Sequence, residues 1–370
     1  MLGHSSPIPS NPPGDAGPDF EVLAVPPDGR DAAVARVMNA GPSDADAVRD
    51  LVGRLEADGG DLSLLWATRR IPCATTATQP PRRDASPFTQ ACLAILGAGR
   101  TAVVLVSPGL PTEHQGKGMH ARARRERAAL LTRACDDLQS LNRDQHRVVL
   151  AQTLLEPDAH DLITAFEDAG FRRLADLGYL RRSIPSPHRA GARPSRLPPG
   201  VRVATLADID PQFQQAVLAQ VLEKTYVGTL DCPDLCGLRS VGDVIDSHRA
   251  VGTFDPSLWL LVLEDQPADS IPGSRLRGSP EGCMLLSAGS APDTVELVYL
   301  GLSPALRGRG IGDELIAAGL ARLAGRPEST IACAVDLANG PALSLYRRAG
   351  FKRFTERVAL VREIPGAPTA

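Results

Sequence analysis

The sequence predicts an α+β fold of three layers, arranged as two tandem and related domains. Three observations lead to this prediction: an alternation of strand-like and helix-like segments, a proline-rich segment near the middle of the chain, and an internal repeat. Short apolar segments typical of strands alternate with amphipathic segments whose apolar residues recur at helical spacing. The 370 residues are enough for two domains of ordinary size.

The domain boundary is indicated by a segment rich in proline, glycine and arginine that runs from Ser183 to Gly200. Proline and glycine interrupt regular structure, so such a segment is typical of a linker. We therefore expect a linker over 186–199, a first domain over 19–185 and a second over 200–365. Residues 1–18, rich in proline, glycine and serine, are expected to form a disordered tail.

The internal repeat relates the two halves. Residues 151–185 align with 331–365 without a gap, and the tripeptide Ala-Gly-Phe at 169–171 falls on the same tripeptide at 349–351. Identical arginine, leucine, isoleucine and proline residues follow at aligned positions. An ordered match with common end points favours a duplicated domain.

Each half is predicted to contain a similar series of elements. In the second half we expect strands over 201–204, 257–264, 282–288, 294–302, 330–335 and 351–363 (the last being one strand or two), and helices over 211–224, 241–251, 311–323 and 341–348. In the first half we expect strands over 21–25, 62–67, 91–96, 102–106 and 147–154, and helices over 31–39, 44–56, 125–141 and 159–169.

Composition excludes several classes of function. With 43% apolar and 22% charged residues the chain has the balance of a soluble globular protein, and a net charge of −3 gives no general attraction for nucleic acid or an anionic membrane. No apolar run is long enough to span a bilayer, and the N-terminus lacks the features of a secretory signal. The seven scattered cysteines suit reduced thiols in a cytoplasm, and the close pair Cys232 and Cys236 has no second pair at zinc-site spacing, so we expect no metal.

The clearest functional motif is a glycine-rich turn between a strand and a helix. It consists of Arg307, Gly308, Arg309, Gly310, Ile311 and Gly312. Glycines let the backbone approach an anion, and the first amides of a helix have no partners inside the helix, so the turn can cradle a pyrophosphate. Arg307 and Arg309 are expected to add positive charge near it. It lacks the Gly-Lys-Ser/Thr of a P-loop, and the antiparallel-style strands before it argue against a dinucleotide-binding βαβ unit.

This stretch resembles motif A of the GNAT (Gcn5-related N-acetyltransferase) superfamily, Gln/Arg-x-x-Gly-x-Gly/Ala, which Arg307, Gly310 and Gly312 fill. The stretch from Asn339 through Leu345-Tyr346 to Ala349-Gly350-Phe351 resembles the family's motif B. The resemblance covers 201–365 directly and 19–185 only through the repeat.

The resemblance implies that each domain is GNAT-like, with a mixed, mostly antiparallel sheet flanked by helices. It implies that acetyl-coenzyme A lies where the fourth and fifth strands of a domain separate. The backbone of Leu300, Gly301 and Leu302 would then pair with the pantetheine amides, and the amides of 307–312 would hold the pyrophosphate. Asn339 would contact the cofactor, or would simply cap the following helix. Gly301 would suit the bulge that is common in this strand of the family.

Two residues are candidates for proton transfer. Tyr346 matches the family's general-acid tyrosine, and the alternative is a core tyrosine on an amphipathic helix. Glu296 resembles the general-base glutamate of the histone-acetylating branch, and the alternative is an ordinary edge or surface carboxylate. A glutamate in an otherwise apolar strand is costly to bury without a partner, which makes its position notable.

The first half departs from these motifs. In the segment that includes Gln115 and Gly118, His120 stands where the second glycine belongs, while Phe166 replaces the tyrosine and Ala159 the asparagine. We therefore expect a non-catalytic GNAT-like domain that packs on the active one. The alternative is a second coenzyme A site that uses Arg124, Arg125 and the start of the helix. The basic run over 121–127 is expected to be a solvated helix face rather than a nucleic-acid patch.

The acceptor is expected to be the amine of a small molecule or peptide, with specificity from the loop between the first two helices of the second half. Tyr226, Asp231 and Arg239 are candidates to line that cleft, and a purely structural loop is the alternative. The tandem layout is similar to that of the mycothiol synthases, although the residues indicate nothing further about that substrate. We expect a cytoplasmic, monomeric or homodimeric acetyltransferase, with a non-catalytic acyl-coenzyme A sensor as the alternative.

Overall fold

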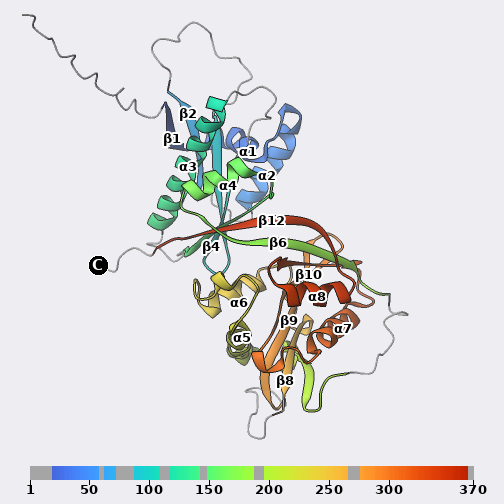
Figure 1. Cartoon of the computed structure of the whole chain (residues 1–370). Helices are drawn as coiled ribbons and strands as arrows, with labels where there is room; N and C mark the ends of the chain where they lie inside the picture. The colour runs from blue at the N-terminus through green and yellow to red at the C-terminus, as the bar shows by residue number, and fades with distance from the viewer. Residues whose placement is uncertain are drawn as a thin grey trace, which may run out of the picture. The chain divides into compact units, whose positions relative to one another are not determined.

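The computed structural model describes residues 19–57, 62–71, 87–108, 117–141, 148–186, 196–265 and 276–365 (Figure 1). The expected tail and most of the expected linker lie outside these residues, as does Gln115. The chain forms two compact units, Met1–Leu93 with Val106–Ala134, and Ala94–Leu105 with Cys135–Ala370. The domain bounds drawn from the sequence stay a prediction. Within the described residues no helix is both long and apolar enough to cross a membrane.

The described residues of the first unit form three antiparallel strands and three α-helices. These are β1 (Phe20–Ala24), β2 (Leu65–Arg70), the start of β3 (Gln90–Gly97), α1 (Arg30–Met38), α2 (Ala45–Ala57) and most of α3 (Lys117–Ser140). Helix α3 begins well before the expected start at Arg125. Arg124 and Arg125 therefore lie inside the helix and not in its first turn, where the alternative coenzyme A site was expected.

The basic run on α3 is only partly the solvated face that we expected, because Arg124 and Arg125 are exposed while its last two residues are buried. Glu126 and Arg127 are each only 2% exposed. The Glu126 carboxylate accepts hydrogen bonds from Thr68, Thr89 and Arg122 at 2.6–3.0 Å. Thr68 of β2, Thr89 just before β3 and Arg122 of α3 thus satisfy the buried carboxylate. The contacts with Thr68 and Thr89 could not be inferred from the helix sequence alone.

The second unit contains a mixed sheet with the strand order β4-β5-β12-β6-β11-β10-β9-β8-β7. Its strands are β4 (Thr101–Val106), β5 (Leu150–Leu155), β6 (Arg172–Ser183), β7 (Val201–Thr205), β8 (Trp259–Glu264), β9 (Ser279–Ala291), β10 (Thr294–Leu302), β11 (Thr330–Asp336) and β12 (Lys352–Glu363). Its helices are α4 (His160–Asp168), α5 (Pro211–Tyr226), α6 (Val241–Arg249), α7 (Ile311–Leu323) and α8 (Gly340–Arg348). Apart from β6, which was not among the predicted strands, these elements follow the predicted order closely, and β12 is one strand with two irregularities rather than two strands.

The last strands of the two halves are exchanged. Strand β12 pairs with β5 of the first half, β6 pairs with β11 of the second half, and β6 and β12 pair with each other. These two strands lie side by side in Figure 1. Their residues occupy the same place in the internal repeat, as do those of α4 and α8. The duplication is therefore visible both in the sequence and in the three-dimensional fold.

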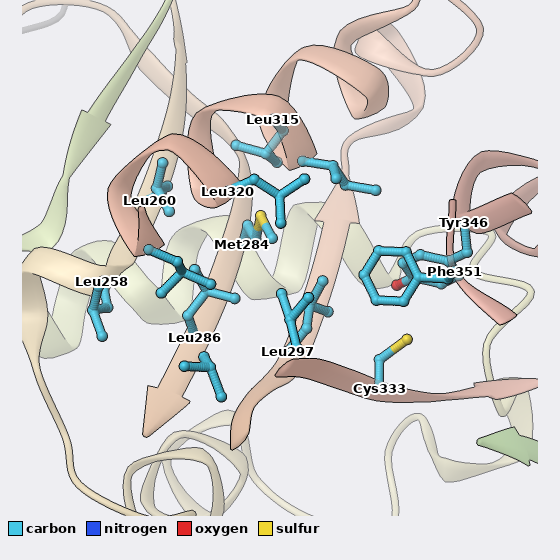
Figure 2. Close-up of a cluster of buried hydrophobic side chains, with 14 of the residues drawn as sticks. Leu258, Leu260, Met284, Leu286, Leu297, Leu315, Leu320, Cys333, Tyr346 and Phe351 are labelled. Atoms are coloured by element: carbon cyan, nitrogen blue, oxygen red, sulfur yellow. The ribbon is translucent and has the colours of Figure 1, made fainter. Parts of the chain in front are cut away.

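Two hydrophobic clusters cover opposite faces of the strands β8, β9 and β10. Alternate residues of β8 point to opposite sides, so Leu260 and Val262 join one cluster while Leu261 and Leu263 join the other. The first cluster packs under α7 and α8 and includes Leu315, Leu320, Tyr346 and Phe351 (Figure 2). The second packs under α5 and α6. The sheet is thus held between two helical layers, as the predicted three-layer fold requires.

Candidate active site

A cavity of about 620 Å³ opens where strands β10 and β11 separate. The two strands pair in parallel only over Thr294–Glu296 and Thr330–Ala332. Beyond Glu296, β10 continues beside β9 and β11 continues beside β6. The edge of β10 that faces away from β9 is therefore left without a neighbouring strand, and its backbone groups are available to a ligand.

The cavity collects most of the residues that the sequence singled out for the cofactor. Its lining includes Leu300, Gly301, Leu302, Arg307, Gly308, Gly310, Ile311, Gly312 and Asn339, together with Asp231 from the proposed acceptor loop. Arg309, Glu296, Tyr346, Tyr226 and Arg239 do not line it. The strand, the glycine-rich turn and the start of α8 are thus brought together around one space.

The glycine-rich turn has the backbone that the sequence predicts. Gly308 and Gly310 have φ angles of 73° and 77°, a conformation that favours glycine, and the space around both is open. Gly310 is the N-cap of α7 and provides no side-chain cap, so the first amides of the helix are not capped by that residue. Gly312 has a different role, because a side chain there would approach Leu345 of α8 within 3.0 Å.

Arg307 does not direct its side chain toward the open turn. Its guanidinium donates hydrogen bonds to the carbonyl oxygens of Leu302 at 3.0 Å, Gly228 at 2.8 Å and Thr225 at 2.8 Å. Arg309 pairs instead with Glu264 at 2.9 Å. The expectation that both arginines add positive charge at the phosphates therefore receives no support from their side chains. Arg307 ties the end of β10 to the C-terminal end of α5.

Tyr299 lines the cavity and forms an aromatic wall with Tyr226 and His248, a feature that was not predicted from the sequence. Its hydroxyl lies 2.8 Å from Oγ1 of Thr225, its ring meets that of Tyr226 edge-on at 5.8 Å, and the imidazole of His248 stacks on it at 5.7 Å. Burial lowers the pKa of His248 to about 4, so the ring is neutral near pH 7. Gly301 is needed here, because a side chain would meet the Tyr299 hydroxyl at 2.4 Å.

The bulge of β10 explains how Tyr299 reaches this position. The register with β9 shifts between Leu297 and Tyr299, so the irregularity lies at Val298 and not at Gly301 as expected. The extra residue turns Tyr299 toward α5 and α6, where Val298 also packs. A bulge depends on pairing with another strand, and the strand sequence itself carried no signal for it.

Asp231 and Asn339 connect the acceptor loop with the end of β11. The amide of Asp336 donates to Asp231 at 3.0 Å, and the amide of Cys232 donates back to Asp336 at 3.2 Å. Asn339 caps α8 by accepting from the amide of Ala342 at 3.1 Å, and its side chain also bonds Asp231. Asp231 lines the cavity, and burial of its carboxyl group raises the pKa, with a further contribution from Asp336.

Tyr346 lies beside the cavity, within the core under α8. It is 5% exposed, its ring meets Phe351 at 5.4 Å, and Figure 2 shows both residues near Cys333. Burial raises its pKa well above the ordinary value, with further contributions from Cys333, Asp231 and Tyr299. The phenol is therefore protonated at neutral pH, and two of the groups that influence its pKa, Asp231 and Tyr299, line the cavity.

Glu296 occupies the last paired position of β10 before the strands separate. It is partly buried, and its partner on β9 is Ser287, whose hydroxyl bonds the loop after α6. Its side chain thus points to the same face of the sheet as α5 and α6. Tyr346 and Cys333 belong to the opposite face.

Helix α6 is held by a turn that belongs to the first half of the sequence. Arg100 makes a two-bond ion pair with Asp243, and Ser247 donates to the carbonyl oxygen of Ala98 at 2.9 Å. Arg239 bonds the carbonyl oxygen of Gly99 at 3.2 Å and Ser247 at 2.7 Å. Arg239 therefore stabilises the contact between this turn and α6. Helix α6 in turn places His248 against Tyr299 in the aromatic wall.

Comparisons with known proteins agree with this geometry. A model of the acetyltransferase (GNAT) family matches residues 246–351. The mycothiol acetyltransferase of Clavibacter sepedonicus is 29% identical over 276 residues, which span 72% of this chain and 83% of that protein. The mycothiol acetyltransferase of Rhodococcus erythropolis is 33% identical over 122 residues, which span 32% of this chain and 38% of that protein.

The fold is shared with a solved structure over almost its entire length. The GCN5-related N-acetyltransferase from Sphaerobacter thermophilus matches with a TM-score of 0.52 at 18% identity, and covers 95% of this chain and 98% of that one. The family match over residues 246–351 and the mycothiol acetyltransferase relatives support a GNAT-type N-acetyltransferase. The solved structure shares the fold of this chain, in agreement with a tandem GNAT architecture.

Proposed function

We propose that the second half of the chain transfers the acetyl group of acetyl-coenzyme A to a primary amine, by direct attack of the amine within a ternary complex. The observation that carries this proposal is the cavity at the separation of β10 and β11, bounded by a free strand edge at one end and the turn 307–312 at the other. The strand edge suits the pantetheine amides, and the turn with the first amides of α7 suits the pyrophosphate.

The proposed chemistry needs a neutral amine, a polarised thioester and a proton for the departing thiolate. Tyr346 is our candidate for the acid, because burial keeps its phenol protonated. Glu296 is our candidate for the base, because it lies where the strands separate and on the face opposite to Tyr346.

The duplicated fold supports the role of the Tyr346 hydroxyl. At the equivalent position of α4, Phe166 is fully buried and meets Phe171 edge-on at 4.9 Å, much as Tyr346 meets Phe351. The first half achieves this packing without a hydroxyl. The oxygen of Tyr346 is therefore not required by the core, and a chemical role explains its presence. The same comparison supports a non-catalytic first half.

The proposal is tested by two measurements on the full chain. Calorimetric titration with acetyl-coenzyme A and coenzyme A measures binding, and release of free thiol with a panel of amines measures transfer. The panel should include small amines, amino sugars, aminoglycosides, peptides and the acceptor of mycothiol acetyltransferases. Binding together with amine-dependent thiol release supports the proposal. Binding without release from any amine would instead indicate an acyl-coenzyme A sensor.

The order of steps is tested separately by initial rates at varied concentrations of both substrates. Intersecting double-reciprocal lines are expected for a ternary complex. Parallel lines would indicate a covalent acyl-enzyme and would contradict direct attack.

A further inference from the structure

One row of side chains runs across the sheet from Glu296 into a strand of the first half. Glu296 of β10 pairs with Ala332 of β11, Ala332 pairs with Arg181 of β6, and Arg181 pairs with Lys352 of β12. Paired residues of neighbouring strands point to the same face. Glu296 and Arg181 therefore stand on one face, two strand spacings or roughly 10 Å apart at the backbone, with the small side chain of Ala332 between them.

Two of the charged side chains of this row, those of Glu296 and Arg181, have no partner of opposite charge in the described part of the chain. Neither side chain makes an ion pair or a hydrogen bond there. By contrast, neighbouring arginines are occupied: Arg357 pairs with Glu156 at 2.8 Å, and Arg353 with Glu356 at 2.8 Å. A carboxylate and a guanidinium left unpaired on one face, above a small residue, form a complementary pair of contacts for a ligand that carries both charges.

Aromatic rings lie beside Arg181, the positively charged residue of the row that is nearest to Glu296. The Arg181 guanidinium lies 4.8 Å from the centre of the Phe354 ring, and Phe354 meets Tyr179 edge-on at 6.3 Å. Phe354 is 48% exposed, so this part of the face is open within the second unit. The ring orients Arg181 without neutralising its charge, because a cation above an aromatic face remains available for a carboxylate.

We propose that the acceptor is an amine that also carries a carboxylate, with the amine placed at Glu296 and the carboxylate bound by Arg181. This inference rests on the proposed function, and it assigns part of acceptor recognition to β6, the strand that the first half contributes. The spacing suits an amine and a carboxylate separated by several bonds. An α-amino acid holds its two groups too close together to reach both contacts.

The test compares matched acceptors on the full chain. The ω-amino acids from glycine to 6-aminohexanoate are each compared with the alkylamine of the same carbon number, and kcat/KM is measured for both. We expect the longer amino acids to be preferred over their alkylamines by about 10- to 100-fold, the range of a hydrogen bond to a charged group. Glycine should show the smallest preference.

Three variants separate recognition from a structural effect. Arg181→Gln should reduce the preference for amino acids to near unity, mainly through KM, and Arg181→Lys should restore part of it. Lys352→Gln is the matched control, because it removes the same charge from the same row one strand further from Glu296, and it should leave the preference unchanged. Thermal unfolding of each variant checks that the sheet is intact.

The possible outcomes distinguish the two proposals. If alkylamines are acetylated as well as the amino acids, or if Arg181→Gln lowers both equally, the carboxylate assignment is overturned while the acetyltransferase proposal stands. If acetyl-coenzyme A binds but no amine of either series or of the wider panel is acetylated, both proposals are overturned.

Discussion

Replacing Arg307 by lysine tests whether the motif arginine acts through its charge or through its geometry. Lysine keeps the positive charge but cannot reach three carbonyl oxygens at once, because its ammonium is a single point rather than a planar fork. The bonds to Leu302, Gly228 and Thr225 are 2.8–3.0 Å long, and all three would be weakened or lost. If charge alone mattered, the variant would behave like the parent protein.

The expected loss of stability follows from these three bonds. A typical hydrogen bond contributes about 0.5–1.5 kcal/mol, and the residue is exposed, so water replaces part of each interaction. We expect a loss of about 1–2 kcal/mol in the free energy of unfolding. For a unit of this size that corresponds to a decrease of roughly 2–8 °C in Tm. Because Thr225 also holds Tyr299, we expect kcat to fall more than the affinity for coenzyme A.

The assay is thermal unfolding with and without coenzyme A, combined with calorimetric titration of coenzyme A. The matched control is Arg309→Lys, two residues away, whose single surface ion pair with Glu264 contributes at most about 1 kcal/mol. An Arg307→Lys protein with the parent Tm and the parent kcat would refute a structural role for the three hydrogen bonds of Arg307. A parent Tm together with a large loss of coenzyme A affinity would instead assign the side chain to the phosphates.

Four further predictions follow from the site and its support. Tyr346→Phe should lower kcat by roughly 10- to 1000-fold with little change in coenzyme A affinity, and an unchanged kcat would reject it as the acid. Glu296→Gln should lower kcat by about 100-fold, whereas an unchanged kcat would place the base elsewhere. Gly99→Ala should destabilise the protein by about 2 kcal/mol or more in chemical unfolding, because the residue has a φ angle of 67° and its side chain would meet the Asp243 carbonyl oxygen at 1.9 Å; equal stability would show that the turn can move away. Arg100 lowers the pKa of Asp243, so the stability from this pair is complete above the ordinary carboxyl pKa of about 4 and is lost as pH falls through the lowered pKa; Asp243→Asn should flatten that part of the stability–pH curve, and a parallel curve would contradict the pairing.

The sequence predicted the local features of the fold well, because they depend on neighbouring residues. The apolar periodicity of 311–323 gave both ends of α7, and the turn over 307–312 was recognised from its glycines. The backbone of that turn is a local property, since a positive φ at Gly308 and Gly310 requires only glycine itself. The same reasoning placed Asn339 at the start of α8.

The features that the sequence did not predict depend on contacts between distant segments. The side chain of Arg307 was expected at the phosphates, but its partners lie in and just after α5, far away in the sequence. Tyr299 was overlooked because a bulge in the pairing of β10 with β9 brings it to the cavity. Strand β6 was not predicted by periodicity, although shifting the predicted 351–363 strand by the repeat would have located it.

The exchange of β6 and β12 links this fold to its function. Because β6 lies between β11 and β12, the residues across the sheet from Glu296 come from the first half of the sequence, while the glycine-rich turn and Tyr346 come from the second. The turn that holds α6 also comes from the first half. Under the proposed function, the first half supplies Arg181 and supports His248 whether or not it binds a cofactor of its own. Both contributions depend only on the strand exchange and on the turn at 97–100.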